Sequence, residues 1–442
     1  MIDIKALRAD PGAAREALAR RGDGVETRVD HVLELDERRR ALLPQVEDLR
    51  AEAKRRSKDV GARMKALSEL PADEAAAQRA EITAWAKEPT VQAESLRAEL
   101  DEVEGKFQQA LLLVPNLPDP TAAPEDTVVR EVGTPRTFDF EVKDHLQLSG
   151  DAVDMERGAR LSGSRFAYLK GELVQLELAL VQWVLAKLSG QDFVPVIPPV
   201  LVREQALMGT GFLPDTEQQI YHLPADDLYL VGTSEVALAS LHAGEILDAA
   251  ELPLRYAGYS PCFRREAGAA GSADRGLFRV HQFDKVEMFA FVEPGNAVAE
   301  HERILGIEES ILSDLGLPYR VVNIAVDDLG PSAAKKFDCE AWLPSQGKYR
   351  ELTSASNTTD FQARRLDVRY RPKTDDGPGK PETLATLNGT AVAVGRTIIA
   401  ILENHQQADG TVNVPAVLHP FGAPTVLFAG RAAAAAPDAP AE

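Results

Sequence analysis

The spacing of hydrophobic residues changes along the chain and predicts different elements before and after about residue 113. Between about residues 28 and 110, apolar residues recur three and four apart, as in the series Leu35, Leu42 and Leu49. This spacing is typical of the seam between two helices of a coiled coil. Residues 67–74, LSELPADE, can form a turn between the helices. We therefore predict an antiparallel hairpin of two long helices.

Each predicted helix contains one proline, Pro44 in the first and Pro89 in the second. A proline inside a helix removes a backbone hydrogen bond and usually kinks the helix. Both prolines lie about 22 residues from the midpoint of the predicted hairpin. We therefore expect them to lie opposite one another and to bend the hairpin, unless one of them starts a new helical segment after a break.

Helical and strand-like patterns alternate in the rest of the chain. Residues 166–190 and 392–407 are strongly apolar and predict helices, whereas residues 284–292 alternate with period two and predict a strand. The predicted fold class is therefore α+β. The predicted organisation is a helical domain over 1–112, a Pro-rich linker over 113–139, a mixed domain over 140–428 and a disordered tail over 429–442.

Composition narrows the possible classes of protein. The chain has 442 residues, two distant cysteines and a net charge of -20 at pH 7. Two cysteines exclude a disulfide framework and a cysteine-based zinc site. No apolar signal segment is present, and no apolar run reaches the roughly 20 residues of a membrane span. We therefore expect a cytoplasmic protein that binds neither zinc nor a membrane.

The acidic total argues against nucleic acid as a partner, but net charge describes the whole surface and binding is local. Residues 50–65 carry seven basic and two acidic side chains. This basic run is compatible with a nucleic-acid contact and equally with an ordinary solvated helix face.

Residues 262–283, CFRREAGAAGSADRGLFRVHQF, place four arginines around a loop of small residues, namely Arg264, Arg265, Arg275 and Arg279. Strand-like stretches flank the loop and predict a β-hairpin with a long tip. Phe283, Lys285 and Glu287 share one face of the return strand, because side chains alternate along a strand. Guanidinium groups match phosphate oxygens. The hairpin is therefore compatible with a ligand that carries phosphate between an aromatic ring and an amine, although arginine-rich surface hairpins without a ligand are common.

Four further stretches accompany the hairpin in a fixed order, GTSEVAL (232–238), RELTSASN (350–357), TLNGTAVAVGRT (386–397) and ILENHQQADG (401–410). Together they make the chain resemble bacterial-type seryl-tRNA synthetases, which are class II aminoacyl-tRNA synthetases, from MIDIKALR to VPAVLHPF. The arginine hairpin resembles motif 2 of that class, residues 386–407 resemble motif 3, and residues 194–202 resemble motif 1. The resemblance implies a tRNA-binding helical arm and a catalytic domain built on an antiparallel β-sheet flanked by helices.

The resemblance implies two reaction steps, in which serine and ATP form seryl-adenylate and the seryl group then passes to the 3′ end of serine tRNA, or of selenocysteine tRNA where present. Arg264 is implied to bridge the α-phosphate and the serine carboxylate, and Arg396 to hold the γ-phosphate. Mg²⁺ is implied on Glu351 and Ser354. The other implied ATP-binding residues are Arg265, Glu266, Arg279, Val280, Phe283, Leu352 and Thr353.

The resemblance also implies a set of serine-binding residues, which are Thr233, Ser234, Glu235, Arg264, Glu287 and Thr390. In this set Glu287 meets the ammonium group and Thr390 meets the hydroxyl group of serine. A site that satisfies a hydroxyl group rejects alanine, because its buried polar groups would otherwise stay unpaired. Thr390 stands where other members have Ser, and Ala355 replaces a larger or polar residue; neither change alters the implied chemistry.

The resemblance also implies that the helical arm recognises tRNA. Lys54, Arg55, Arg56 and Lys58 are implied to contact phosphates of the long variable arm of serine tRNA. The family's homodimer is also implied, with the arm of one subunit serving tRNA whose acceptor end enters the other subunit.

Several other functions are compatible with parts of the sequence. Ligases that charge a carrier protein lack the long arm, and zinc-dependent seryl enzymes differ in cysteine supply and motif spacing. A specialised duplicate, for antibiotic resistance or biosynthetic seryl-tRNA supply, stays open because its core site would be unchanged. Retention of Arg264, Glu287 and Arg396 argues against a non-catalytic tRNA-binding relative. Cys262 and His281 are predicted to be structural.

Overall fold

The chain forms two compact units, Ile2–Pro115 and Met1 with Asn116–Glu442. This computed structural model describes residues 1–214, 219–267, 276–374 and 377–429. Among the described residues, no helix is long and apolar enough to cross a membrane.

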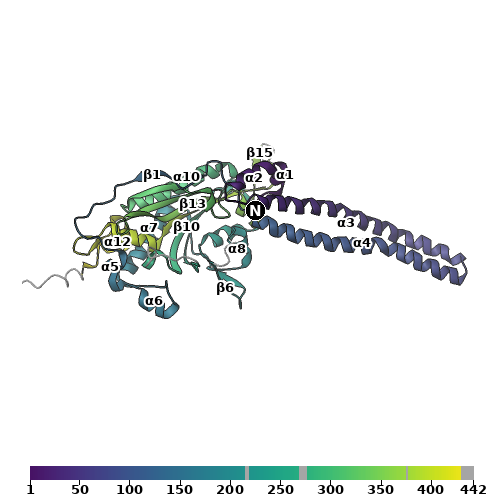
Figure 1. Cartoon of the computed structure of the whole chain (residues 1–442), viewed down its shortest axis with the longest axis horizontal. Coiled ribbons are helices and arrows are strands. Elements are labelled where there is room, and N and C mark those ends of the chain that lie inside the picture. Colours follow the sequence, from purple (N-terminus) through teal and green to yellow (C-terminus); the bar gives the residue numbers. More distant parts are fainter. Residues whose placement is uncertain (215–218, 268–275, 375–376, 430–442) are drawn as a thin grey trace, which may run out of the picture. The chain divides into compact units, whose positions relative to one another are not determined.

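The first unit is a helical hairpin preceded by two short helices, α1 (Ile4–Ala9) and α2 (Pro11–Ala19). Its long helices α3 (Thr27–Ala66) and α4 (Ala72–Leu113) run side by side in opposite directions, joined by a short turn that includes η1 (Leu67–Glu69) (Figure 1). Apolar side chains of the predicted seam are buried, among them Leu35, Leu42, Leu100, Val103 and Phe107. The predicted helical hairpin is therefore confirmed.

The expected alignment of the two prolines is wrong. Pro44 and Pro89 both lie inside unbroken helices. Ion pairs between the helices join Arg38 to Glu99 and Arg56 to Glu88 (2.5 and 3.0 Å). Pro89 therefore lies level with Ala51 and its neighbours, about two helical turns from the level of Pro44. The reason is that the helices reverse closer to residue 70 than to the midpoint between the prolines.

The second unit is built on an eight-stranded sheet with the order β1-β11-β12-β13-β18-β10-β9-β4. All neighbouring strands in it are antiparallel except β4 and β9, which are parallel. In sheet order, the strands are Thr127–Val132, Tyr319–Asn323, Lys335–Leu343, Lys348–Asn357, Ala385–Ala393, Gln282–Val292, Leu254–Phe263 and Val194–Val196. The predicted antiparallel-sheet domain is thus confirmed, and its edge strand β1 lies within the segment for which a linker was predicted.

In the described part of the chain, a hydrophobic core lies between helices and the sheet on each side of β10. Val286, Met288 and Ala290 of β10 belong to the larger core, together with α7 (Glu172–Ser189), α10 (Ala297–Asp314) and α12 (Val394–Asn404). Alternate residues of β10 point to the other side of the sheet. There Phe289 and Phe291 pack with apolar residues of α9 (Glu235–Ala239) and α11 (Phe361–Leu366).

Short elements complete the second unit. The helices are α5 (His145–Ser149), α6 (Met155–Ser162) and α8 (Glu204–Thr210). The strands are β2 (Val153–Asp154), β3 (Tyr168–Leu169), β5 (Leu201–Val202), β6 (Tyr221–Leu223), β7 (Leu228–Leu230), β8 (Ile246–Asp248), β14 (Arg369–Arg371), β15 (Lys373–Thr374), β16 (Gly377–Pro378), β17 (Glu382–Thr383), β19 (Val412–Asn413) and β20 (Val426–Leu427).

Candidate active site

Strands β9 and β10 form the predicted arginine hairpin, but the return strand starts later than Leu277, where the strand-like stretch LFRVHQF after the loop begins. It begins at Gln282, because Gly276–Phe278 form a 3-10 turn, η7. The backbone N–H of Arg264 donates to the His281 carbonyl (3.0 Å), and His281 Nδ1 lies 2.9 Å from the Arg264 carbonyl oxygen. His281 therefore closes the end of the hairpin, in agreement with a structural role. Arg275 lies outside the described residues.

A cavity of about 470 Å³ opens beside this hairpin. Most of the predicted site residues line it, although they come from segments far apart in the sequence. These residues are Thr233, Glu235, Arg264, Glu266, Arg279, Val280, Phe283, Glu287, Glu351, Leu352, Ser354, Thr390 and Arg396. The predicted face of β10 is confirmed, because Lys285 lines the cavity between Phe283 and Glu287.

Three predicted residues do not line the cavity. Ser234 is buried and donates to the Gly258 carbonyl oxygen (3.2 Å). Thr353 donates to the Glu308 carboxylate (2.9 Å), because strand alternation turns it away from the side of Ser354. Arg265 uses its backbone N–H to reach the Gln219 carbonyl oxygen (2.9 Å), and its side chain is not part of the lining.

Arg264 is one of the residues that form the cavity wall. Its Nε donates to the Gly232 carbonyl oxygen (3.1 Å), and its guanidinium carbon lies 5.4 Å from the centre of the Phe283 ring. These contacts fix the plane of the guanidinium group beside an aromatic surface. Arg279, also in the wall, forms an ion pair with Glu266 (3.3 Å).

Arg396 lies at the start of α12 and reaches Glu351 on β13. Its terminal nitrogen donates to the Glu351 carbonyl oxygen (3.1 Å) and lies 3.3 Å from the carboxylate. Its guanidinium carbon is 4.9 Å from the centre of the Phe278 ring. Phe278 was not among the predicted site residues, because it has no motif signal of its own.

The oxygen groups near Glu351 fit a hard divalent cation. Burial raises the pKa of Glu351, but the charges of Arg396 and Lys336 outweigh burial, so that the pKa lies below its usual value. Ser354 Oγ lies 3.4 Å from the Glu351 carboxylate. No group of three His, Cys, Asp or Glu side chains suited to a metal occurs in the described part of the chain. This donor set suits Mg²⁺, which commonly takes one or two carboxylates together with substrate phosphates.

The opposite end of the cavity holds a buried polar cluster on β10 and β18. Glu287 and Lys285 form a buried ion pair. Glu287 and Thr390 are cross-strand partners, and Thr390 Oγ1 donates to Glu287 (3.4 Å). An ammonium group would find a carboxylate here, and a hydroxyl group would find a hydroxyl partner.

Glu235 lies behind this cluster and is held by amide groups. Its Oε1 accepts hydrogen bonds from Gln362 Nε2 (2.8 Å) and Asn388 Nδ2 (3.0 Å). Burial, with a smaller contribution from Glu287, raises the pKa of Glu235 to about 7. Gln362 and Asn388 were not among the predicted site residues. Asn388 stands two residues before Thr390 on one strand face, so alternation could have found it, whereas nothing local marks Gln362.

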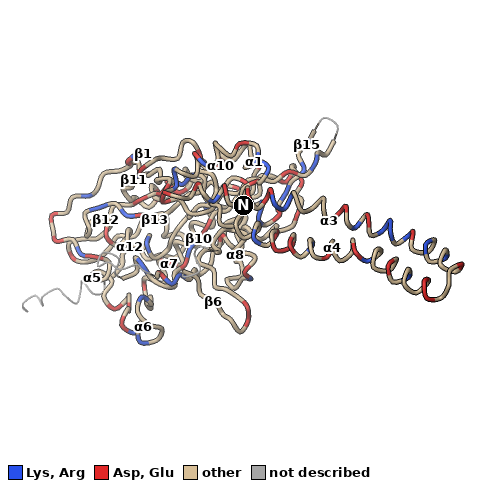
Figure 2. The backbone as a smooth tube through the Cα atoms, turned by 45° about the vertical axis from the view of Figure 1, so that its right-hand side comes forward, with Lys and Arg blue, Asp and Glu red and all other residues tan. Residues whose placement is uncertain are grey.

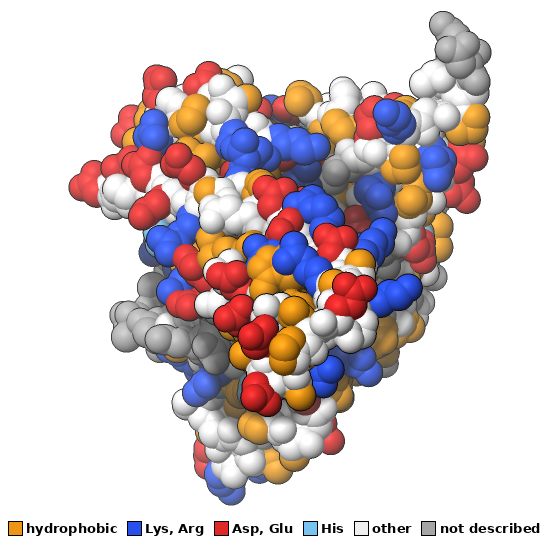
Figure 3. Space-filling model, turned by 90° about the vertical axis from the view of Figure 1, so that its right-hand side faces the viewer, with side chains coloured by type: hydrophobic (Ala, Val, Ile, Leu, Met, Phe, Trp, Pro, Cys, Tyr) orange, Lys and Arg blue, Asp and Glu red, His pale blue; other side chains and the backbone are white. Residues whose placement is uncertain are grey.

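Some basic side chains of residues 50–65 form ion pairs with acidic side chains of the arm itself. Arg55 and Arg56 pair with Glu52 (2.7 and 2.8 Å), and Arg56 also pairs with Glu88. Lys54 and Lys58 are exposed, and no ion pair of theirs is found among the described residues. Figure 2 shows the basic positions of α3 interspersed with acidic ones, and the face drawn in Figure 3 mixes both signs in the same way.

Two family models match the chain. Residues 1–118 match the seryl-tRNA synthetase N-terminal domain, and residues 221–405 match the tRNA synthetase class II core domain (G, H, P, S and T).

Serine–tRNA ligases of other organisms are similar to this chain over nearly its whole length. The serine–tRNA ligase of Acidothermus cellulolyticus is 51% identical over 433 residues, which cover 97% of this chain and 99% of that protein. The crystal structure of seryl-tRNA synthetase from Pyrococcus horikoshii complexed with ATP is similar with a TM-score of 0.86 and 40% identity, covering 96% of this chain and 99% of that one. The cytoplasmic serine–tRNA ligase from Naegleria fowleri in complex with AMP has a TM-score of 0.83 and 32% identity, covering 96% and 98%.

Proposed function

The chain belongs to the seryl-tRNA synthetase family of class II aminoacyl-tRNA synthetases, and on this premise we propose how its own residues carry out the ligase reaction. In the first step, a carboxylate oxygen of L-serine attacks the α-phosphorus of ATP. The bond from this phosphorus to the bridging oxygen breaks, pyrophosphate leaves, and seryl-adenylate remains. In the second step, a terminal ribose hydroxyl group of serine tRNA attacks the seryl carbonyl carbon, and AMP leaves.

One observation carries the proposal. A single cavity holds guanidinium groups and a phenyl ring at one end and the buried Glu287–Lys285 pair with Thr390 at the other. ATP and an amino acid with a hydroxyl group fit these two ends in one orientation. Arg264 lies between the ends, where the α-phosphate and the serine carboxylate must meet.

Positioning and charge stabilisation account for most of the first step. Arg264 neutralises the negative charge that builds up on the α-phosphate oxygens, and its bond to the Gly232 carbonyl orients it before ATP arrives. Arg396 binds the terminal phosphates of ATP, and Arg279 assists it. Phe283 provides the flat surface for adenine, and the backbone of Val280 reads the edge of the base.

Glu351 and Ser354 hold Mg²⁺ in this proposal, and the ion supplies positive charge for the phosphate oxygens when it is bound. The lowered pKa of Glu351 supports the assignment, because a metal ligand must be ionised. Without ATP, Arg396 forms an ion pair with the Glu351 carboxylate. We expect this ion pair to break when Arg396 binds the phosphates of ATP.

Serine specificity rests on the buried end of the cavity. Glu287 binds the ammonium group, Thr390 accepts or donates a hydrogen bond to the substrate hydroxyl, and Thr233 and Glu235 complete the wall. Alanine carries the same ammonium group but no hydroxyl group, so it would leave Thr390 without its substrate partner, which costs binding energy.

The partners are part of the same proposal. Exposed Lys54 and Lys58 support a contact between the arm and the phosphates of serine tRNA. A homodimer is supported by exposed apolar side chains on α7, on β4 and directly after β4, where Val174, Leu178, Val194 and Ile197 are 40, 51, 56 and 83% exposed. We place the reaction in the cytoplasm, as expected from the cysteine content and from the family.

Amino-acid-dependent exchange between pyrophosphate and ATP, measured without tRNA, tests the proposal. We expect exchange with serine and little with threonine, alanine or cysteine. Thr390→Val should reduce the preference for serine over alanine about tenfold or more, because it removes the hydroxyl partner at similar volume. A folded protein that binds ATP but supports no exchange with serine would contradict the proposed function.

A further inference from the structure

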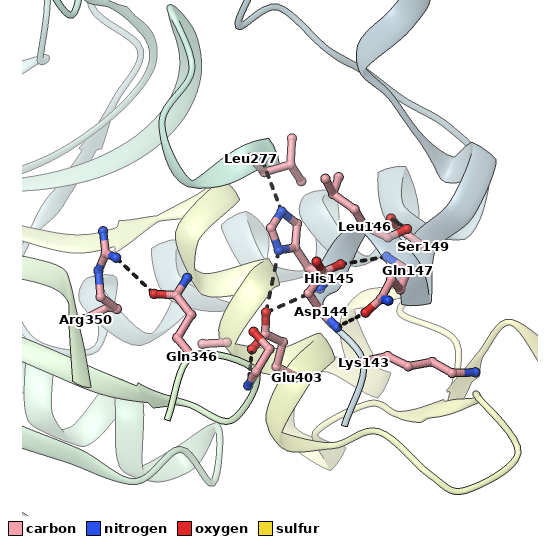
Figure 4. A network of polar contacts seen from close by, with 12 residues as sticks. Lys143, Asp144, His145, Leu146, Gln147, Ser149, Leu277, Gln346, Arg350 and Glu403 are labelled. Carbon is pink, nitrogen blue, oxygen red and sulfur yellow. Dashed lines mark hydrogen bonds and ion pairs between the residues drawn. The ribbon is translucent and has the colours of Figure 1, made fainter. Parts of the chain in front are cut away.

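A buried histidine and glutamate lie next to the nucleotide end of the cavity, and the reaction described above does not use them. His145 is the first residue of α5, and Glu403 lies near the end of α12. Both are buried, with 4% and 0% of their surfaces exposed. Figure 4 shows the imidazole ring between the Glu403 carboxylate and the backbone of Leu277.

The hydrogen bonds define the role of each ring nitrogen. Nε2 of His145 accepts a hydrogen bond from the backbone N–H of Leu277 (3.3 Å). The ring is therefore protonated on Nδ1, which lies 3.6 Å from Glu403 Oε1. Glu403 also accepts hydrogen bonds from the backbone N–H groups of His145 (3.3 Å) and Ser345 (3.1 Å). The carboxylate thus fixes the orientation of the ring that holds Leu277.

Leu277 belongs to the 3-10 turn η7, whose residues Leu277 and Phe278 line the cavity. His145 packs closely under this turn, since a Cβ atom at Gly276 would lie 2.2 Å from its Nε2. Two guanidinium groups contact the Phe278 ring, with Arg350 at 3.9 Å and Arg396 at 4.9 Å from its centre.

The 3-10 turn η7 also supports Arg396, the arginine proposed to bind phosphate. Nε of Arg396 donates to the Phe278 carbonyl oxygen (3.4 Å). Arg396 and Glu403 belong to the same helix, α12, at its two ends. The contacts therefore form a closed loop that runs from Glu403 through His145 and the turn to Arg396, and back along the helix.

We propose that His145, oriented by Glu403, is a positioning residue that holds the turn Gly276–Phe278 and thereby Arg396 in the geometry that binds ATP. The proposal rests on the proposed function, because it assigns the nucleotide end of the same cavity. His145 has no part in the serine end of the cavity, whose groups lie on β10 and β18. Loss of the Leu277 hydrogen bond should therefore affect ATP and leave serine almost untouched.

Two conservative substitutions separate the two contacts of the ring. In His145→Gln, the amide oxygen can replace Nε2 as the acceptor for Leu277. In His145→Asn, the shorter side chain can reach only as far as Nδ1 and keeps the Glu403 contact. In serine-dependent ATP–pyrophosphate exchange, we expect His145→Asn to raise KM for ATP about tenfold, since a buried N–H group loses its partner. We expect KM for serine to change less than twofold, and His145→Gln to restore most of the ATP affinity.

A matched control is His405→Asn, whose shorter side chain cannot reach as far as Nε2 of the native ring. His405 is also a partly buried histidine bonded to a backbone group, the Leu315 carbonyl oxygen (2.8 Å), but it does not line the cavity. This variant should lose thermal stability without a change in KM for ATP. Equal KM values for ATP in His145→Asn, His145→Gln and wild type, or parallel changes for ATP and serine, would overturn the positioning role. Absence of exchange in the wild type would instead overturn the proposed function.

Discussion

At the scale of single residues, Glu235 combines burial with a charge that the fold does not fully compensate. Its two nearest partners, Gln362 and Asn388, are neutral amides. Burial, with a smaller effect of Glu287, raises its pKa to about 7, so the folded protein retains a proton there that the unfolded chain has already lost at lower pH.

This pKa predicts a pH-dependent stability that one substitution should remove. Because the folded pKa is raised, the stabilisation is complete below the unfolded value, about pH 4.5, and is lost as pH rises to about 7. Glu235→Gln should therefore gain stability relative to wild type as pH rises, by up to about 3 kcal/mol at pH 8. Thermal unfolding of both proteins at pH 5 and pH 8 measures the effect. An unchanged difference in Tm at the two values would show that Glu235 is ionised in the folded protein throughout.

The serine end also shows what strand alternation could and could not predict. The period of two correctly placed Phe283, Lys285 and Glu287 on one face before any tertiary contact was known. Residues 351–354, by contrast, were assigned as one unit by resemblance. Alternation sends Thr353 to the other side of β13, where it bonds to Glu308. A motif states which residue types recur, whereas the strand decides which of them face the ligand.

At the scale of elements, α10 approaches strand β18 of the sheet closely at Gly389. Gly389 of β18 faces α10, and a Cβ atom there would lie 2.3 Å from Ile304 and 2.8 Å from Glu308. The helix that covers the sheet behind the serine end can therefore approach only because β18 has no side chain at this position.

Gly389→Ala should push α10 away from the sheet and lower the free energy of unfolding by about 1–3 kcal/mol, as is usual for overpacking. Chemical denaturation followed by fluorescence measures the change. The matched control is Gly306→Ala in α10 itself, where a Cβ atom meets nothing within 4 Å. This exposed helical site should gain about 0.5–1 kcal/mol, because alanine favours the helix. A stability loss in the control, or none at Gly389, would contradict the packing explanation.

The helical arm was predictable as an element, but its register was not. The heptad spacing of Leu35 and Leu42 arises from local geometry and was sufficient to predict the hairpin. The alignment of Pro44 with Pro89 depended on where the chain reverses. The helices instead align through pairs such as Arg38 with Glu99. A shift of a few residues in the turn changes every pair along the arm.

At the scale of the whole molecule, a chain with net charge -20 must bind a polyanion through a local basic surface. In the double variant Lys54→Glu and Lys58→Glu, we expect kcat/KM for serine tRNA to fall about tenfold or more at low salt, through lost phosphate contacts. Exchange between pyrophosphate and ATP without tRNA should stay unchanged. Lys106→Glu is the matched control on α4, where the lysine already pairs with Glu102. Equal aminoacylation by all three proteins would exclude this surface from tRNA binding.

The exposed apolar surface of α7 and β4 gives a second prediction at this scale. Ile197→Glu should convert a dimer into a monomer at micromolar concentration, because it places a charge on this apolar surface. Sedimentation velocity measures the assembly. Leu161→Glu, at another strongly exposed apolar residue (71% exposed), is the control and should remain dimeric. A wild-type protein that sediments as a monomer would contradict the homodimer.

The sequence by itself determined the elements and the chemical groups of this protein. Heptad spacing and period-two alternation follow from the geometry of the backbone over a few residues, so the arm and the face of β10 could be predicted locally. Tertiary structure alone decided which distant groups meet. Glu287 lies beside Thr390 across 103 residues, and His145 bonds to Leu277 across 132 residues. Such contacts depend on which surfaces pack together, and no local pattern in the chain carries that information.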